Sequence, residues 1–88
     1  MNDFKLRIAT PNGSVFDGRA VKLDVRGVAG DLAVMAGHIP FITAVVGGRC
    51  HVMTEESDLN GTIDGGLLNV MKNETVLLVG RYTPDSDQ

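Results

Sequence analysis

The chain has 88 residues, 43% of them hydrophobic and 22% charged, which is enough for one small domain and too apolar for a disordered chain. Eleven acidic against eight basic side chains give a net charge of −3, and without a basic stripe this disfavours nucleic acid as a partner. No apolar stretch approaches the roughly 18 residues of a membrane helix, and residues 1–5 predict no secretory signal.

Short segments separated by glycines predict strands in the first part of the chain. Residues 4–8 and 21–26 alternate apolar and polar side chains, as strands with one buried face do. Pro11-Asn12-Gly13 predicts a turn after the first strand, and Asp17-Gly18 predicts another after the short strand 14–16. Since a glycine in a helix interior costs about 1 kcal/mol relative to alanine, the eleven glycines leave little room for helices.

The second part of the chain continues the same pattern. Asn60-Gly61 predicts a hairpin turn between strands at 52–54 and 62–63, and residues 72–74 are expected to join the last two strands. We therefore expect an all-β sandwich or barrel over residues 1–83, followed by a polar tail at 84–88.

Three segments are apolar on consecutive residues instead of alternating: 32–36, 41–46 and 76–79. Strands of this kind place apolar side chains on both faces, whereas a two-layer sandwich covers only the inner face of each sheet. Two outcomes are open. Either an apolar patch remains exposed and marks a partner surface, or loops or a closed barrel cover it.

Motifs for common catalytic chemistry are weak. Residues 27–31 contain two glycines, but Asp31 stands where a phosphate loop would hold the phosphates, and its negative charge is wrong for that role. A single cysteine excludes an internal disulfide and a cysteine-rich zinc site. Cys50 and His51 are adjacent, so in a strand they point to opposite faces and cannot form a thiolate–imidazole pair. We expect Cys50 to be buried and His51 to be solvated.

Two polar residues near turns have both a structural and a functional interpretation. His38 lies in a turn between apolar strands, where its ring either bonds to nearby backbone or contacts a partner. Asp31 either caps a turn or offers an acidic contact. The carboxylates of Glu55, Glu56 and Asp58 are expected at a solvated hairpin tip.

The order of the motifs resembles that of the epsilon subunit of F-type ATP synthase, in its N-terminal domain. The most specific stretch, residues 30–44, follows that family's Gly-Asp/Glu, Pro-Gly-His-x-Pro and Leu-Leu-Thr pattern. The other matching segments are residues 4–13, 15–18, 65–70 and 73–78. The resemblance implies a ten-stranded β-sandwich of two five-stranded sheets.

The resemblance also implies a function. The subunit would be a non-catalytic part of the central stalk, without a cofactor or metal. It would link the gamma subunit to the membrane ring of c subunits and support coupling of ion-driven rotation to ATP synthesis. Its place would be the cytoplasmic face of the bacterial inner membrane, as a peripheral part of the complex.

Individual positions follow from the same resemblance. Gly30 and Asp31 match a turn that faces the c ring, and Thr10, His38 and Thr43 match positions facing gamma. Two features depart from the family. Ala36 replaces the usual proline before Gly37-His38, and the helical hairpin that carries inhibition or ATP binding is not expected after residue 88.

Two other functions remain as alternatives. A free-standing β-sandwich adaptor or ligand-binding module predicts a concave pocket in place of a flat apolar face. A small hydrolase using His38 and Asp31 predicts these two side chains within hydrogen-bond reach, beside a nucleophile.

Overall fold

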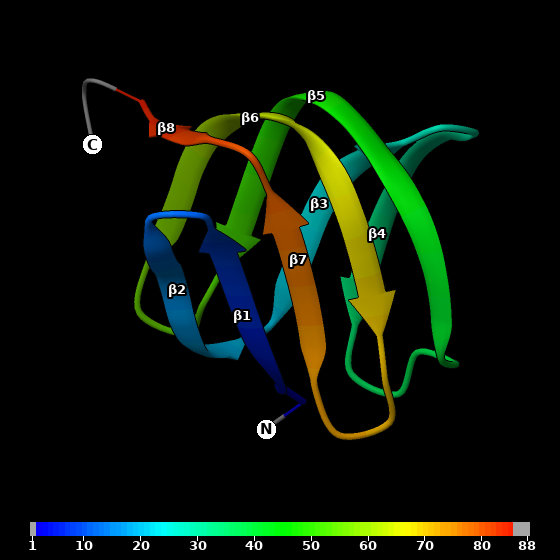
Figure 1. Ribbon diagram of the computed structural model, residues 1–88. Coiled ribbons are helices and arrows are strands. Elements are labelled where there is room, and N and C mark those ends of the chain that lie inside the picture. The colour runs from blue at the N-terminus through cyan, green and yellow to red at the C-terminus, as the bar shows by residue number, and fades with distance from the viewer. Residues whose placement is uncertain (1, 86–88) are drawn as a thin grey trace.

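Strands account for the regular structure of the chain (Figure 1). The computed structural model describes residues 2–85. Two strands, β5 and β6, are 13 residues long, and the others have three to eight residues. The strands are β1 (Phe4–Thr10), β2 (Gly13–Ala20), β3 (Lys22–Gly27), β4 (Gly30–Met35), β5 (Phe41–Met53), β6 (Asp58–Val70), β7 (Thr75–Val79) and β8 (Tyr82–Pro84).

Pairing runs in the order β2-β1-β7-β6-β5-β3-β4, and β8 pairs with β6. Every pair is antiparallel except β1 with β7. The two long strands curve over the top of the molecule, so their halves belong to different layers (Figure 1). The first layer holds β2, β1, β7 and the halves of β6 and β5 next to them. The second layer holds β8, β3, β4 and the other two halves.

The all-β sandwich prediction is confirmed, but the structure has eight continuous strands where ten were expected. The difference arises because β5 and β6 each run through a bend without interruption. The register is the same on both sides of the bend, where Val46 pairs with Gly65 and Gly48 with Ile63, and only the position between them, Gly47 opposite Asp64, is left out of the pairing. If both strands are divided at this bend, the pairing places five segments in each layer.

Glycines make the bend possible. Gly48 and Gly65 have φ of +153° and +105°, which side-chain-bearing residues rarely adopt. A Cβ on Gly66 would overlap the carbonyl oxygen of Leu78 on the neighbouring strand. The glycine pairs of the sequence therefore mark the point where the chain passes from one layer to the other.

The core lies between the layers and is aliphatic. The alternation expected for residues 4–8 and 21–26 is confirmed, because Leu6, Ile8, Leu23 and Val25 are buried. The buried apolar residues that form this core are Leu6, Ile8, Ala20, Leu23, Val25, Val34, Val45, Cys50, Val52, Ile63, Leu68, Val70, Leu77 and Val79.

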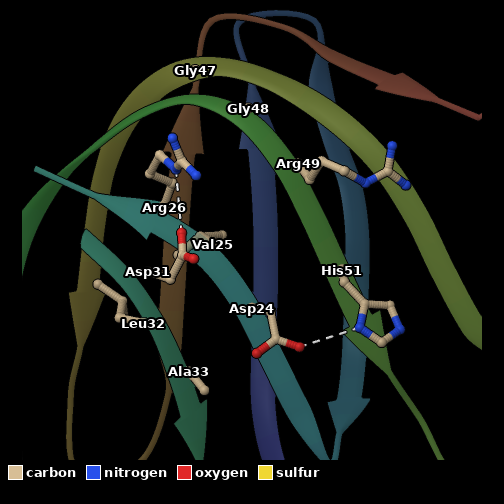
Figure 2. A pocket seen from close by; sticks show the side chains of 10 residues that line it. All are labelled: Asp24, Val25, Arg26, Asp31, Leu32, Ala33, Gly47, Gly48, Arg49 and His51. Atoms are coloured by element: carbon tan, nitrogen blue, oxygen red, sulfur yellow. Dashed lines mark hydrogen bonds and ion pairs between the residues drawn. The ribbon is translucent and has the colours of Figure 1, made fainter.

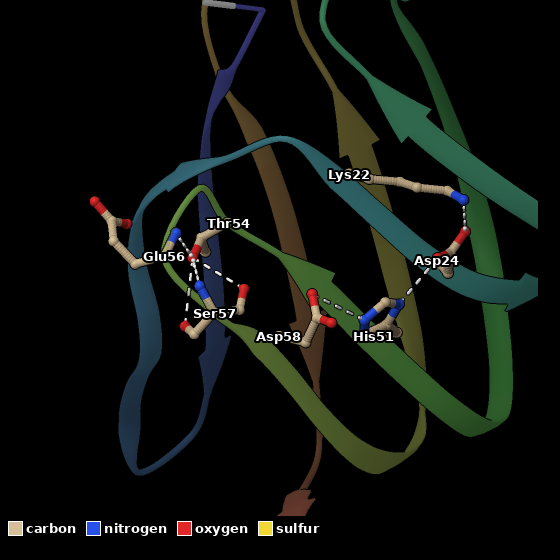
Figure 3. Close-up of polar contacts among 7 residues, drawn as sticks. All are labelled: Lys22, Asp24, His51, Thr54, Glu56, Ser57 and Asp58. Atoms are coloured by element: carbon tan, nitrogen blue, oxygen red, sulfur yellow. Dashed lines mark hydrogen bonds and ion pairs between the residues drawn. The ribbon is translucent and has the colours of Figure 1, made fainter.

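The expected hairpin turn at Asn60-Gly61 is wrong. Both residues lie inside β6, where Asn60 pairs with His51 and Gly61 with Cys50. The turn occurs earlier, at Thr54, whose hydroxyl accepts the backbone N–H groups of Glu56 and Ser57 (Figure 3). Gly61 is glycine for another reason. A Cβ there would lie 2.5 Å from the ring of Tyr82, so the absence of a side chain lets Tyr82 cover the strand.

The pairing at the C-terminal end extends beyond residue 83. Pro84 completes β8, the backbone N–H of Asp85 donates to the carbonyl of Asn60 at 3.0 Å, and Arg49 donates to the Asp85 carboxylate at 2.7 Å. Residues 86–88 of the predicted tail lie outside the described residues. Within residues 2–85, no helix has the length and apolar character needed to cross a membrane.

Candidate interaction surface

Large apolar side chains remain exposed on the outer face of the first layer. Ile42 on β5 is 63% exposed, Leu67 on β6 is 43% exposed and Leu78 on β7 is 47% exposed. The register places Ala44, Leu67, Leu78 and Ala9 next to one another across four strands, where paired residues share a face. We call Ala9, Ile42, Ala44, Val46, Leu67 and Leu78 the outer apolar stripe.

This stripe decides between the two outcomes left open for the doubly apolar segments. Residues 41–46 bury Val45 and expose Ile42 and Val46, whereas residues 76–79 bury all of their side chains except that of Leu78. The expectation of an exposed patch is therefore confirmed there, and cover by the chain's own loops is wrong. An apolar face on a sandwich that already has its own core is typical of a surface that binds a partner.

Two threonines lie close to the stripe. Thr10 ends β1 and, with Ala9 and Leu78, lines a shallow depression of about 350 Å³ beside the stripe. Its hydroxyl accepts the backbone N–H of Asn12 at 3.1 Å and donates to the carbonyl of Gly13 at 3.3 Å. Thr43 lies between Ile42 and Ala44 but pairs with the buried Leu68, so its side chain points to the opposite face of β5.

His38 lies in the connection between β4 and β5 and is exposed. Its Nδ1 is 3.1 Å from the carbonyl oxygen of Ile39, a contact that requires the proton on Nδ1. The ring centroid lies 5.0 Å from that of Phe41, the first residue of β5. These contacts confirm that the ring bonds to nearby backbone, and they hold the turn against the start of β5.

Gly30 and Asp31 begin β4, directly after the two-residue turn at the tip of the β3–β4 hairpin. Gly30 has φ of +126°, and the side chain of Asp31 is 81% exposed. The Asp31 carboxylate accepts a hydrogen bond from Arg26 at 3.2 Å, its direct partner across the hairpin. The neighbouring Val28 N–H donates to the carbonyl of Ala44 at 3.3 Å, so the hairpin tip is attached to β5 beside the stripe.

The structure does not bring Asp31 and His38 together. They lie at opposite ends of β4, and each contacts residues near its own end: Arg26 for Asp31, and Ile39 and Phe41 for His38. The hydrolase alternative required these side chains to share a hydrogen bond, so its central geometric requirement is not met.

A groove of about 710 Å³ lies between the β3–β4 hairpin and the bend of β5 (Figure 2). Four of its ionisable side chains come in pairs: Arg26 with Asp31, and His51 with Asp24 at 3.2 Å. Arg49 pairs outside the groove lining, with Asp85. The ten lining residues include no serine, threonine or cysteine, so a nucleophile beside a base is missing here.

His51 differs from its expected solvated state. Its Nδ1 is 3.2 Å from the Asp24 carboxylate and its Nε2 is 3.6 Å from that of Asp58, so the ring bridges three strands (Figure 3). The cause is register, because Asp24 is the direct partner of His51 on β3. Within residues 2–85, no group of three or more His, Cys, Asp or Glu side chains could hold a metal ion.

Cys50 is buried, as expected, with 1% of its surface exposed. Burial raises the pKa of its thiol to about 11, and the charge of Asp24 acts in the same direction. Because the thiolate is the reactive form, Cys50 is protonated and unreactive at neutral pH.

We expect Cys50 to react with an aromatic disulfide reagent only after unfolding. Ellman's reagent at neutral pH should show almost no free thiol in the native chain and one thiol per chain in denaturant. The raised pKa also means that stability is retained below pH 9 and falls as the pH rises from 9 towards 11, because only the unfolded thiol ionises in that range. Rapid labelling of the native chain would contradict the buried position.

A β-sandwich with its own core and an exposed apolar stripe is typical of a small interaction module. The family model described as "ATP synthase, Delta/Epsilon chain, beta-sandwich domain" matches residues 3–84. The chain therefore belongs to this family, and the resemblance seen in the sequence is confirmed.

Curated relatives agree with this family. The chain is 34% identical over 76 residues to the sodium ion specific ATP synthase epsilon chain of Acetobacterium woodii, covering 85% of this chain and 57% of the relative. It is 39% identical over 75 residues to the ATP synthase epsilon chain of Lacticaseibacillus casei, covering 82% and 52%. The chain thus spans about half the length of the curated relatives it matches.

Two solved structures share the fold. A chain in the Euglena gracilis mitochondrial ATP synthase, in an OSCP/F1/c-ring structure, superposes with a TM-score of 0.87 at 18% identity, covering 93% of this chain and 53% of that one. A chain in the central stalk/c-ring structure of the Tetrahymena thermophila enzyme gives 0.78 at 9% identity, covering 90% and 64%. These similarities extend the fold assignment to distant sequences.

Proposed function

We propose that the chain is a non-catalytic central-stalk subunit of an F-type ATP synthase. It links the gamma subunit to the c ring and supports coupling of ion-driven rotation to ATP synthesis. The complex lies at the cytoplasmic face of a bacterial inner membrane, and the chain is peripheral to that membrane. The observation that carries this proposal is the outer apolar stripe on a domain of the delta/epsilon family.

The mechanical role requires stiffness and two attachment points. Torque passes through packed contacts, and a close-packed aliphatic core of low compressibility suits that purpose. The outer apolar stripe supplies one attachment, to gamma. Thr10 borders it and His38 fixes the turn that leads into β5, and we assign both to the gamma side; the side chain of Thr43 points to the opposite face of β5, so we assign it no gamma contact.

The β3–β4 hairpin tip supplies the second attachment. Gly30 adds no side chain next to Asp31, and Asp31 offers an exposed carboxylate to basic groups on the loops of the c ring. Asp31 must share or release Arg26 to make such a contact. An exposed ion pair contributes only about 0–1 kcal/mol, so this exchange costs little.

Exchanging Asp31 for lysine is expected to weaken docking to an isolated c ring while the domain stays folded. The reversed charge repels basic loop groups, whereas substitution of so exposed a side chain changes stability by about 0.5 kcal/mol or less. A pull-down with the purified c ring measures the loss. Asp58→Lys serves as the control. It makes the same charge change at the first residue of β6, which lies near the start of β3 and therefore far from the hairpin turn. Equal binding by both variants would remove the role of Asp31.

A further inference from the structure

The chain contains two Asn-Gly sequences, Asn12-Gly13 and Asn60-Gly61, and the two lie in different structural surroundings. The first is at the tip of the β1–β2 turn and the second is inside β6. Because glycine places no side chain beside its nitrogen, an Asn-Gly sequence is sterically open to cyclisation. We propose that Asn12 is a site of spontaneous deamidation and isoaspartate formation in the native protein, and that Asn60 is protected from this reaction.

The reaction needs only water and base. The backbone nitrogen of Gly13 loses its proton and attacks Cγ of Asn12, and a new C–N bond closes a five-membered succinimide ring. The bond from Cγ to Nδ2 breaks, and the nitrogen leaves as ammonia with the protons it gains. Water then opens the ring at either carbonyl carbon, which yields aspartate or isoaspartate at position 12.

The surroundings of Asn12 leave room for each of these steps. Asn12 and Gly13 are both exposed. The backbone N–H of Asn12 donates to Thr10, while its side-chain amide has no hydrogen-bond partner among residues 2–85. Gly13 has φ of +124°, and no heavy atom lies within 4 Å of the position its Cβ would take. The nucleophile and the amide are therefore both accessible, and no neighbour blocks the ring.

Asn60 and Gly61 are held on both sides. Asn60 pairs with His51 on β5, and its carbonyl accepts the N–H of Asp85 at 3.0 Å. Gly61 is buried between Cys50 and Pro84 and lies under the ring of Tyr82. Cyclisation would require the backbone to turn out of this ladder, so the reaction at Asn60 must wait for local or global opening.

Two Asp-Gly sequences, Asp17-Gly18 and Asp64-Gly65, are slower competitors, since an ionised carboxylate is a poor electrophile. The hydrogen bond from Lys5, at 2.9 Å, lowers the pKa of Asp17 and keeps it ionised. The Asp64 carboxylate accepts the backbone N–H of Arg81 at 2.9 Å. Structure thus ranks Asn12 first among the four sites.

The modification changes the turn in two ways. Either product adds a negative charge beside Thr10, and isoaspartate also lengthens the backbone by one carbon. The Thr10 hydroxyl bridges the Asn12 N–H and the Gly13 carbonyl, so the longer backbone breaks this bridge. The inference rests on the chemistry of the turn alone and holds whether or not the proposed function is correct.

The test follows both asparagines in one sample. The full chain is incubated under native conditions at mildly alkaline pH and then digested with trypsin, which releases residues 8–19 and 50–72 as separate peptides. Mass spectrometry quantifies replacement of the amide by a carboxylate, and labelling with an isoaspartyl methyltransferase quantifies isoaspartate. We expect the 8–19 peptide to accumulate both products at least about tenfold faster than the 50–72 peptide, because the second site must first open.

Two controls make the result specific. In denaturant the two peptides should react at similar rates, which shows that the native difference comes from structure. Asn12→Gln keeps the amide but requires a larger ring, so it should suppress modification of the 8–19 peptide under native conditions. Equal native rates for the two peptides, or no modification at Asn12 during native incubation, would overturn the proposal.

Discussion

Replacing Gly66 by alanine is expected to lower the free energy of unfolding by about 3 kcal/mol or more. Gly66 pairs with Val79, and a Cβ there would overlap the carbonyl oxygen of Leu78. That oxygen belongs to the backbone of a paired strand, so it cannot rotate away as a side chain would. Denaturant unfolding followed by circular dichroism measures the change.

Gly18→Ala is the matched control. Gly18 also lies in a strand, but the nearest heavy atom to its Cβ position is in the Phe16 ring, at an ordinary contact distance of 3.6 Å. Alanine also reduces the conformational freedom of the unfolded chain. We therefore expect the free energy of unfolding of Gly18→Ala to change by less than about 1 kcal/mol, and to increase because the alanine meets no close contact. If the two alanine variants were equally stable, the close passage of β6 and β7 at the bend would be contradicted.

Charging the outer apolar stripe with Leu67→Asp and Leu78→Lys together is expected to weaken binding to gamma by about 30-fold or more, the loss of roughly 2 kcal/mol typical of an interface hot spot. The two positions pair directly across β6 and β7, so the new charges attract each other and leave the net charge unchanged. Both side chains are already half exposed, and the fold should therefore persist. Binding to purified gamma, measured by calorimetry, gives the affinity.

Val28→Asp with Val15→Lys makes the same changes outside the stripe. Both valines are exposed, one at the β3–β4 turn and the other on β2. This control should bind gamma with nearly unchanged affinity while showing the same charge and solubility effects. Equal losses in the two double variants would show that the stripe is not the gamma surface.

Much of the fold could be predicted because it depends on local patterns. The alternation at residues 4–8 and 21–26 was enough to identify buried faces, and the consecutive apolar residues at 41–46 were enough to indicate apolar side chains on both faces. The pattern left open whether the outer set is exposed or covered, and the structure, with Ile42 63% exposed, decides for exposure.

The errors come from contacts distant in sequence. Asn60-Gly61 has the composition of a hairpin turn, but position 61 requires glycine because the ring of Tyr82 packs over it. Tyr82 lies about twenty residues further along the chain. His51 is bonded because Asp24 is its register partner, and register between β3 and β5 cannot be deduced from either strand alone. The same limit applies to the strand count, since nothing local shows that β5 continues through Gly47-Gly48.

Ion-gradient-driven ATP synthesis tests the central proposal most directly. Membrane vesicles carrying the synthase of the same organism, stripped of this subunit, are supplied with the purified chain or with the Leu67→Asp/Leu78→Lys variant. The account predicts that the native chain restores gradient-driven synthesis and that the variant does not at the same concentration. A native chain that binds neither gamma nor the vesicles, and leaves synthesis unrestored, would contradict its assignment to the rotor.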